Sequence, residues 1–254
     1  DGNIKPNKKI ITFFNQQHNY VPLIGDSLFI SKTEVSNGEY HEYVYWILNH
    51  LGRIEYIKTL PDTLVWQRPE TGCEPYSQYY FSHPVYKDYP VLGVTYSQAV
   101  NYCHWRTERR MEAKEGKGLR VDKVQMRLPS EKEWMFAARG TLPDTAIWPW
   151  PGKTIYFTGG RKKDEGKLWL NVKIVISPDE EPDFITTKVK SYAPNTIGLY
   201  NICGNVSEWT LDKTVKGGSW NHPSHMATID YQSSVLGDSI RSATTGFRPI
   251  IQLD

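Results

Sequence analysis

Residues 195–220 constrain the fold of this chain more than any other stretch. They contain Gly198, Gly204 and the pair Gly217-Gly218, and an isolated carboxylate, Glu208, lies between Ser207 and Trp209 in a run that otherwise looks like core. Glycines at this density mark places where the backbone turns tightly or is approached closely. A carboxylate inside an apolar run requires a partner, because an unpaired buried charge is costly. The stretch therefore predicts a packed cluster of turns in which Glu208 faces either a cation or an arginine.

The composition indicates one large domain with little regular structure, although two small domains would also fit 254 residues. Nine Trp and 16 Tyr occur together with 19 Gly and 16 Pro, which is typical of short elements joined by long packed loops. The net charge of +2 gives no electrostatic argument for nucleic-acid binding. No run of 18 apolar residues occurs, so we expect no transmembrane segment.

Three helices are predicted from capping signals. Ser36 with Glu39 forms a capping box, and apolar residues recur behind it at helical spacing as far as Gly52. Similar signals open helices at Thr95 and at Ser130. Short strands are predicted at residues 27–33, 63–66, 217–221 and 246–252, and residues 1–26 form an arm or an edge strand.

The segment 53–94 is rich in proline and tyrosine and lacks strong helix signals, so we expect an ordered but irregular insertion. Its aromatic residues, among them Tyr76, Tyr79 and Tyr80, either pack against one another or form a contact surface for a partner.

The cysteines Cys73, Cys103 and Cys203 are sparse and widely spaced, with no CxxC motif. This pattern argues against a disulfide framework and against a thiolate zinc site. We expect Cys103 and Cys203 to be buried as small apolar residues.

Seven motifs follow one another along the chain. They are ISKTEVSNGEY at Ile30, YPVLGVTYSQAVNYCHW at Tyr89, RLPSEKEWMFAARG at Arg127, WPW at Trp148, IGLYNICGNVSEWT at Ile197, GGSW at Gly217 and TGFR at Thr245. In this order they resemble the formylglycine-generating enzyme family, also called the sulfatase-modifying-factor family. The resemblance covers about residues 27–254 and implies a single α+β domain with a variant of the C-type-lectin-like fold, about three helices, short antiparallel strands and long loops.

Two further stretches, LPDTLVWQRP at Leu60 and YYFSHPVYKDYPVLGVTY at Tyr79, look like the gliding-motility-associated (type IX secretion) lipoproteins of Bacteroidetes. These members of the same family are regarded as structural components of the cell envelope. The likeness implies an exported protein, in the periplasm or at the outer membrane as a lipoprotein. It also implies a binding or scaffold role among other envelope proteins, for which the aromatic insertion at about residues 60–90 is the candidate surface.

The family's enzymes oxidise a substrate cysteine with oxygen, using two cysteines after the GGS motif that bind copper(I), which favours soft thiolate ligands. Here the corresponding positions, counted from Ser219, fall on His222 and Ala227, and no cysteine follows Cys203. The site therefore lacks its nucleophile and its metal ligands. We expect a catalytically inactive site without copper; the alternative is a divergent oxidase that uses other residues.

His222 and His225, three positions apart, offer a second interpretation of the same loop. Two imidazoles at this spacing can share a transition metal if Asp230 or Asp238 supplies a further ligand. The simpler alternative is that both are ordinary loop histidines.

The resemblance also implies a calcium ion at residues 201–208, because the family wraps this segment around one. The ligands carried over are oxygen donors of the kind that Ca²⁺ prefers: the Asn201 side chain, the Gly204 and Val206 carbonyls and the Glu208 carboxylate.

A second calcium site would involve Asn171 and Val172, with Asp183 as the acid, although the spacing there departs from the family pattern. The alternative to calcium at Glu208 is an ion pair with an arginine such as Arg248 or Arg127.

Overall fold

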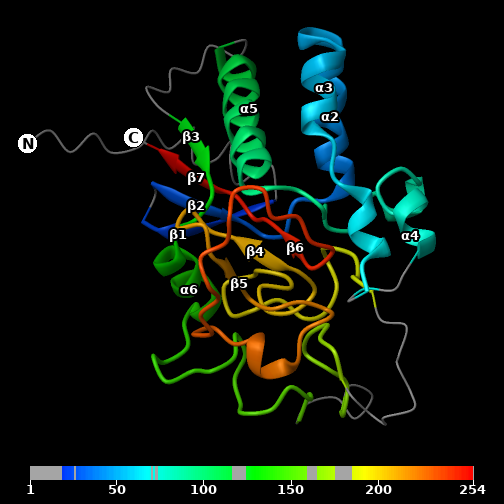
Figure 1. The fold of residues 1–254 in the computed structure, drawn as a ribbon. Coiled ribbons are helices and arrows are strands. Elements are labelled where there is room, and N and C mark those ends of the chain that lie inside the picture. Colours follow the sequence, from blue (N-terminus) through cyan, green and yellow to red (C-terminus); the bar gives the residue numbers. More distant parts are fainter. Residues whose placement is uncertain are drawn as a thin grey trace, which may run out of the picture.

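The structure is a computed structural model that describes residues 19–25, 27–69, 71, 74–115, 124–158, 165–174 and 185–253. Within these residues the chain forms a mixed α+β fold with five α-helices and seven short strands in two sheets (Figure 1). No helix in these ranges has the length and apolar character needed to cross a membrane.

The larger sheet has the order β1-β2-β7-β3 and is antiparallel throughout. Its strands are β1 (Tyr20–Ile24), β2 (Leu28–Ser31), β3 (Val124–Arg127) and β7 (Ile250–Leu253). The strand predicted at residues 27–33 is therefore confirmed, and β1 is the edge strand expected within residues 1–26. Residues 1–18 of the predicted arm lie outside the described part of the chain.

The smaller sheet has the order β5-β4-β6, formed by β4 (Ser207–Trp209), β5 (Val215–Lys216) and β6 (Thr245–Gly246). The expected short antiparallel strands are confirmed in four of the five strand pairings, whereas β4 and β6 run parallel. The strand predicted at residues 217–221 is wrong. Gly217 and Gly218 have φ angles of 90° and 65°, and this left-handed backbone turns the chain away as soon as β5 ends.

The three capped helices are confirmed as α2 (Asn37–Leu51), α5 (Tyr96–Glu115) and α6 (Glu131–Arg139). Complete capping boxes open α2 and α6, in which Ser36 and Ser130 bond reciprocally with the glutamates three residues later.

The segment 53–94 is more regular than expected. It contains two additional helices, α3 (Arg53–Thr59) and α4 (Glu74–Tyr79), and the 3₁₀ turns η1 (Thr63–Gln67) and η2 (Pro84–Tyr86). The strand predicted near residues 63–66 is wrong, because the side chain of Asp62 caps Leu64 N–H and starts η1.

Helix α3 folds back along α2, since the Tyr40 hydroxyl near the start of α2 donates to the Thr59 carbonyl at 3.0 Å. Together with α5, this helical pair rises from one side of the two sheets (Figure 1).

The apolar core forms three clusters. One lies between the larger sheet and helices α2 and α5, and a second joins this sheet to α6 and to Trp148 and Trp150. The third lies beneath the segment 53–94 and is centred on Trp66 and Trp220. The polar segment 201–208 runs between these clusters, so its hydrogen-bonding groups must find partners inside the protein.

Candidate functional site

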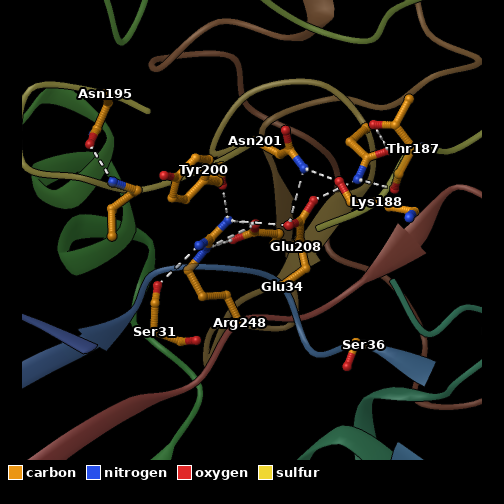
Figure 2. A network of polar contacts seen from close by, with 12 residues as sticks. Ser31, Glu34, Ser36, Thr187, Lys188, Asn195, Tyr200, Asn201, Glu208 and Arg248 are labelled. Carbon is orange, nitrogen blue, oxygen red and sulfur yellow. Dashed lines mark hydrogen bonds and ion pairs between the residues drawn. The ribbon is translucent and has the colours of Figure 1, made fainter. Parts of the chain in front are cut away.

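The segment 201–208 is pressed against residues 170–172. Gly204 has a φ of 79°, and a Cβ atom at this position would lie 2.7 Å from the Asn171 carbonyl oxygen. Only glycine fits here, because both the backbone conformation and the close approach exclude a side chain. This contact leads the chain from Asn201 into strand β4, where Glu208 points into the interior (Figure 2).

Glu208 is paired with Arg248, and both side chains are fully buried. The guanidinium donates from Nη2 to Glu208 Oε1 at 2.7 Å and from Nε to both carboxylate oxygens at 3.1 Å. Trp134 Nε1 on α6 donates to Oε2 at 2.8 Å. Arg248 also donates to the carbonyl oxygens of Ser31 and Tyr200 (Figure 2). The sequence left either a cation or an arginine as the partner of Glu208, and in the structure this partner is Arg248.

Glu34 belongs to the same cluster, although the sequence analysis did not identify it. Its carboxylate is fully buried, lies 3.9 Å from Arg248 Nη2 and accepts a hydrogen bond from Asn205 Nδ2 at 2.8 Å. Burial raises the pKa of Glu34 to about 8, although the charge of Arg248 opposes this shift. Two buried carboxylates thus share one guanidinium. Their charges balance only if Glu34 keeps its proton or a further cation binds.

Asn201 has the geometry of a possible cation ligand. Its φ of 49° is left-handed, and its Oδ1 is buried with no hydrogen-bond partner in the described structure. Its Nδ2 donates to the Lys188 carbonyl at 3.2 Å and lies 3.5 Å from Glu34 Oε2. A buried amide oxygen without a donor suits a hard cation. Asn201 and the charge balance therefore fit calcium, whereas the oxygens of Glu208 already accept from nitrogen donors.

The predicted second calcium loop lies beside the first. Asn171 and Val172 are buried, and the Asn171 carbonyl accepts from Asn205 N–H at 2.8 Å. Asn171 Nδ2 donates to the Ile185 carbonyl at 2.8 Å. Asp183, the expected acid, lies outside the described residues. In the part of the chain that is described, no three His, Cys, Asp or Glu side chains form a group that could hold a metal.

Residues 217–227 form the other half of the candidate site. Gly218 is packed so closely that a Cβ atom would lie 2.7 Å from Ala227 Cα, and Ala227 itself is fully buried. Ser219 Oγ lies 2.9 Å from His222 Nδ1, which fixes the imidazole ring. Burial lowers the pKa of His222, so the ring is neutral near pH 7. His222 and Ala227, the positions predicted to replace the two cysteines, thus follow the same tight turn.

A pocket of about 300 Å³ lies beside this loop. Some of its lining residues lie between Ser207 of β4 and Met226, and they include His222. The others come from residues 231–245. Ala227 faces the core instead of the pocket lining.

The alternative metal site at His222 and His225 is wrong. Asp230 is paired with Arg139 at 2.9 Å, and Asp238 is paired with Lys213 at 2.9 Å. Among the described residues, no group of three His, Cys, Asp or Glu side chains that could hold a metal includes these two histidines, so the third ligand that this site required is missing.

The expectation for the cysteines is confirmed for Cys103 and Cys203. Both are buried free thiols, and burial raises the pKa of each, so neither is a reactive thiolate. Cys73 lies outside the described residues.

The aromatic segment packs largely against itself. Tyr80 is buried, its ring centroid lies 4.8 Å from that of Trp66, and its hydroxyl donates to the Pro90 carbonyl at 2.8 Å. By contrast, Tyr79 is 51% exposed and Val85 is 58% exposed. Of the aromatic residues predicted to form a contact surface, Tyr79 is thus the largely exposed one, and the aliphatic side chains of Val85 and Leu64 (60% exposed) add to the apolar surface of this segment.

Comparisons with known proteins agree with this architecture. The chain is 28% identical to the formylglycine-generating enzyme of Mus musculus over 220 residues, which cover 74% of the chain and 49% of that relative. It is 30% identical to the "Inactive C-alpha-formylglycine-generating enzyme 2" of Mus musculus over 183 residues, which cover 63% of the chain and 48% of that relative. The chain thus spans about half the length of these curated relatives.

Among solved structures, PvdO from Pseudomonas aeruginosa superimposes with a TM-score of 0.58 at 19% identity, covering 89% of this chain and 80% of that one. At this identity the likeness concerns the fold alone. The prediction of a single α+β domain of the formylglycine-generating-enzyme type is confirmed. The model of the sulfatase-modifying factor enzyme 1-like domain matches residues 13–253, and the chain therefore belongs to this family.

Proposed function

We propose that the protein is a non-catalytic member of its family that acts as a binding or scaffold component of the cell envelope. The observation that carries this proposal is the loop after Ser219. His222 and Ala227 occupy the two positions where the family's enzymes carry cysteines, and no cysteine follows Cys203. A divergent oxidase that forms formylglycine with other residues is the alternative.

The packing around this loop supports the loss of thiol chemistry. Ala227 is fully buried against Gly218 and belongs to an apolar cluster. His222 is held by Ser219 and is neutral near pH 7. A neutral imidazole can bind or polarise a ligand, but it cannot replace a pair of soft thiolates in oxygen-dependent thiol oxidation.

Calcium is the structural ion in this proposal. Asn201 Oδ1 supplies an unpartnered buried oxygen, and Glu34, once it releases the proton that burial favours, would add a negative charge that Arg248, already paired with Glu208, does not neutralise. A hard cation would satisfy both features at once. Its role would be to stabilise the segment 201–208.

The envelope assignment rests on the likeness of residues 60–96 to gliding-motility lipoproteins. In this proposal the protein is exported to the periplasm or to the outer membrane as a lipoprotein. Its partners are other envelope proteins, which would contact Tyr79 and Val85. Affinity capture from an envelope extract would lose a specific partner with the double variant Tyr79→Ala and Val85→Ala, but not with Tyr45→Ala, which alters a still more exposed aromatic residue elsewhere. An unchanged set of partners would argue against this surface.

The absence of catalysis is tested directly. The purified protein is incubated with copper, oxygen and a cysteine-containing sulfatase peptide, and the peptide is analysed by mass spectrometry beside an active formylglycine-generating enzyme. We expect the peptide to keep its cysteine. Formation of formylglycine above the background without protein would favour the divergent oxidase.

A further inference from the structure

Residues 232–240 form a strap along one side of the pocket beside His222. None of the strap residues is buried, and the strap contains no helix or strand. Nevertheless, Ser233, Leu236 and Ile240 of the strap line the pocket together with His222. A segment that forms part of a pocket without contributing to the core can move while the core stays intact.

Both ends of the strap are fixed to the body of the protein. Before the strap, Ile229 is fully buried, and its N–H donates to the Ile147 carbonyl at 3.0 Å. After the strap, the Ser242 carbonyl accepts a hydrogen bond from the Gly93 N–H at 3.0 Å, and Ala243 is buried. These two ends therefore act as hinges that confine any movement to the strap itself.

The middle of the strap is tied by two hydrogen bonds to the outer edge of β5. In the sheet order β5-β4-β6, β5 is the outermost strand. Leu236 N–H donates to the Lys213 carbonyl, which lies just before β5, at 2.9 Å. Val215 N–H of β5 donates to Ser233 Oγ, also at 2.9 Å. The strap thus satisfies backbone groups that a further strand would otherwise pair.

An ion pair provides the third tie of the strap. Lys213 Nζ lies 2.9 Å from Asp238 Oδ1, and the two side chains are 45% and 57% exposed. The same Nζ lies 5.4 Å from the ring centroid of Tyr96 on α5. An exposed ion pair is weak and is screened by salt. All three ties are therefore individually weak, and all of them end within residues 213–215.

From this arrangement we infer that the strap is a gate to the pocket, which opens as one unit while its hinges and the core stay closed. Because the three ties end on one short segment, they break together. Opening removes Ser233, Leu236 and Ile240 from the pocket lining and gives solvent access to His222. The gate goes beyond the proposed binding role, and a divergent oxidase would contain it as well.

Amide hydrogen exchange, followed by NMR on the whole chain, tests whether the strap opens as one unit. We expect Leu236 and Val215 N–H to exchange with the same protection factor, at least tenfold below those of Ile229 and Gly93 at the hinges. Asp238→Asn should speed exchange at Leu236 and Val215 equally, by about two- to fivefold. Unequal changes, an equal acceleration at the hinges, or protection of the strap as high as that of the hinges would overturn the inference.

A matched variant and a second measurement separate gating from general loosening. Glu55→Gln removes an ion pair with Lys58 that is exposed to a similar degree, and it should leave Leu236 and Val215 unchanged. An effect of this variant equal to that of Asp238→Asn would also contradict the gate.

Access to the pocket is measured by the reaction of histidines with diethylpyrocarbonate. His225 is exposed and does not line the pocket, so it serves as the internal reference for His222. Asp238→Asn should raise the modification rate of His222 relative to His225 by the same two- to fivefold factor. An unchanged ratio would show that the strap does not control access and would overturn the gate, whereas formylglycine formation would contradict only the non-catalytic role.

Discussion

The two halves of the candidate site, residues 201–208 and residues 217–227, differ in how their polar groups are satisfied. The first half buries Glu208 in a network with Glu34, Asn205 and Arg248, in which almost every polar atom has a specific partner. The second half keeps the tight turn at Gly218 but borders a pocket without charged side chains. If the protein is non-catalytic, as we propose, its fold has retained the charged cluster that holds it together after losing the reactive groups of its active site.

We expect the largest loss of stability from removing Arg248, whose guanidinium is shared by the two buried carboxylates of the first half. The variant Arg248→Met leaves two fully buried carboxylates without their guanidinium, so the free energy of unfolding should fall by about 3–5 kcal/mol. Urea denaturation measures this loss. The control is Arg139→Met, which breaks a pair with the half-exposed Asp230 and should cost less than about 1 kcal/mol. Similar losses for the two variants would show that the buried network stabilises the protein no more than the half-exposed ion pair does.

The turn of the second half provides the next test. Gly218→Ala places a methyl group 2.7 Å from Ala227 Cα at a φ of 65°, so we expect a loss of roughly 2–3 kcal/mol from strain and overlap. Gly25→Ala is matched, because Gly25 has a φ of 52° and open space around its Cβ position. It should cost about 1 kcal/mol. Equal costs would mean that the contact with Ala227 contributes nothing.

We expect the smallest effect from a partly buried ion pair. The Arg127 guanidinium donates two hydrogen bonds of 2.8 Å to Glu133 and lowers the pKa of this carboxyl from its ordinary 4.5 to about 2. A depressed folded pKa stabilises the protein above pH 4.5, and this contribution is lost as the pH falls towards 2.

After allowance for solvent screening, the contribution of this pair is about 1 kcal/mol. The stability of Glu133→Gln, measured by urea denaturation between pH 6 and pH 3, should therefore change less with pH than that of the parent. Parallel pH profiles would show that the Arg127–Glu133 pair adds little.

The sequence predicted elements whose signals are local. The capping boxes at Ser36 and Ser130 contain both partners within four residues, and they gave α2 and α6 correctly. The segment 53–94 was predicted less well, because α4 and η1 depend on packing around Trp66 and Tyr80 that no local pattern records.

The same limit applies to the candidate site. The isolated carboxylate of Glu208 indicated a required partner, but sequence spacing left calcium and arginine as alternatives. Glu34 was missed because its partner Asn205 lies 171 positions away. Glu34 lies between Thr33 and Val35 in a buried run. A carboxylate in such a run is the same pattern that indicated a buried, paired Glu208.

We propose that residues 201–208 hold a hard cation, calcium, whereas residues 217–227 hold no soft one such as copper. Elemental analysis of the purified protein by mass spectrometry tests both parts together. We expect about one calcium ion per chain and no copper, and a chelator should lower the melting temperature of the parent but not of Asn201→Ala. Stoichiometric copper, or a calcium-free protein whose melting temperature ignores added calcium, would contradict the account.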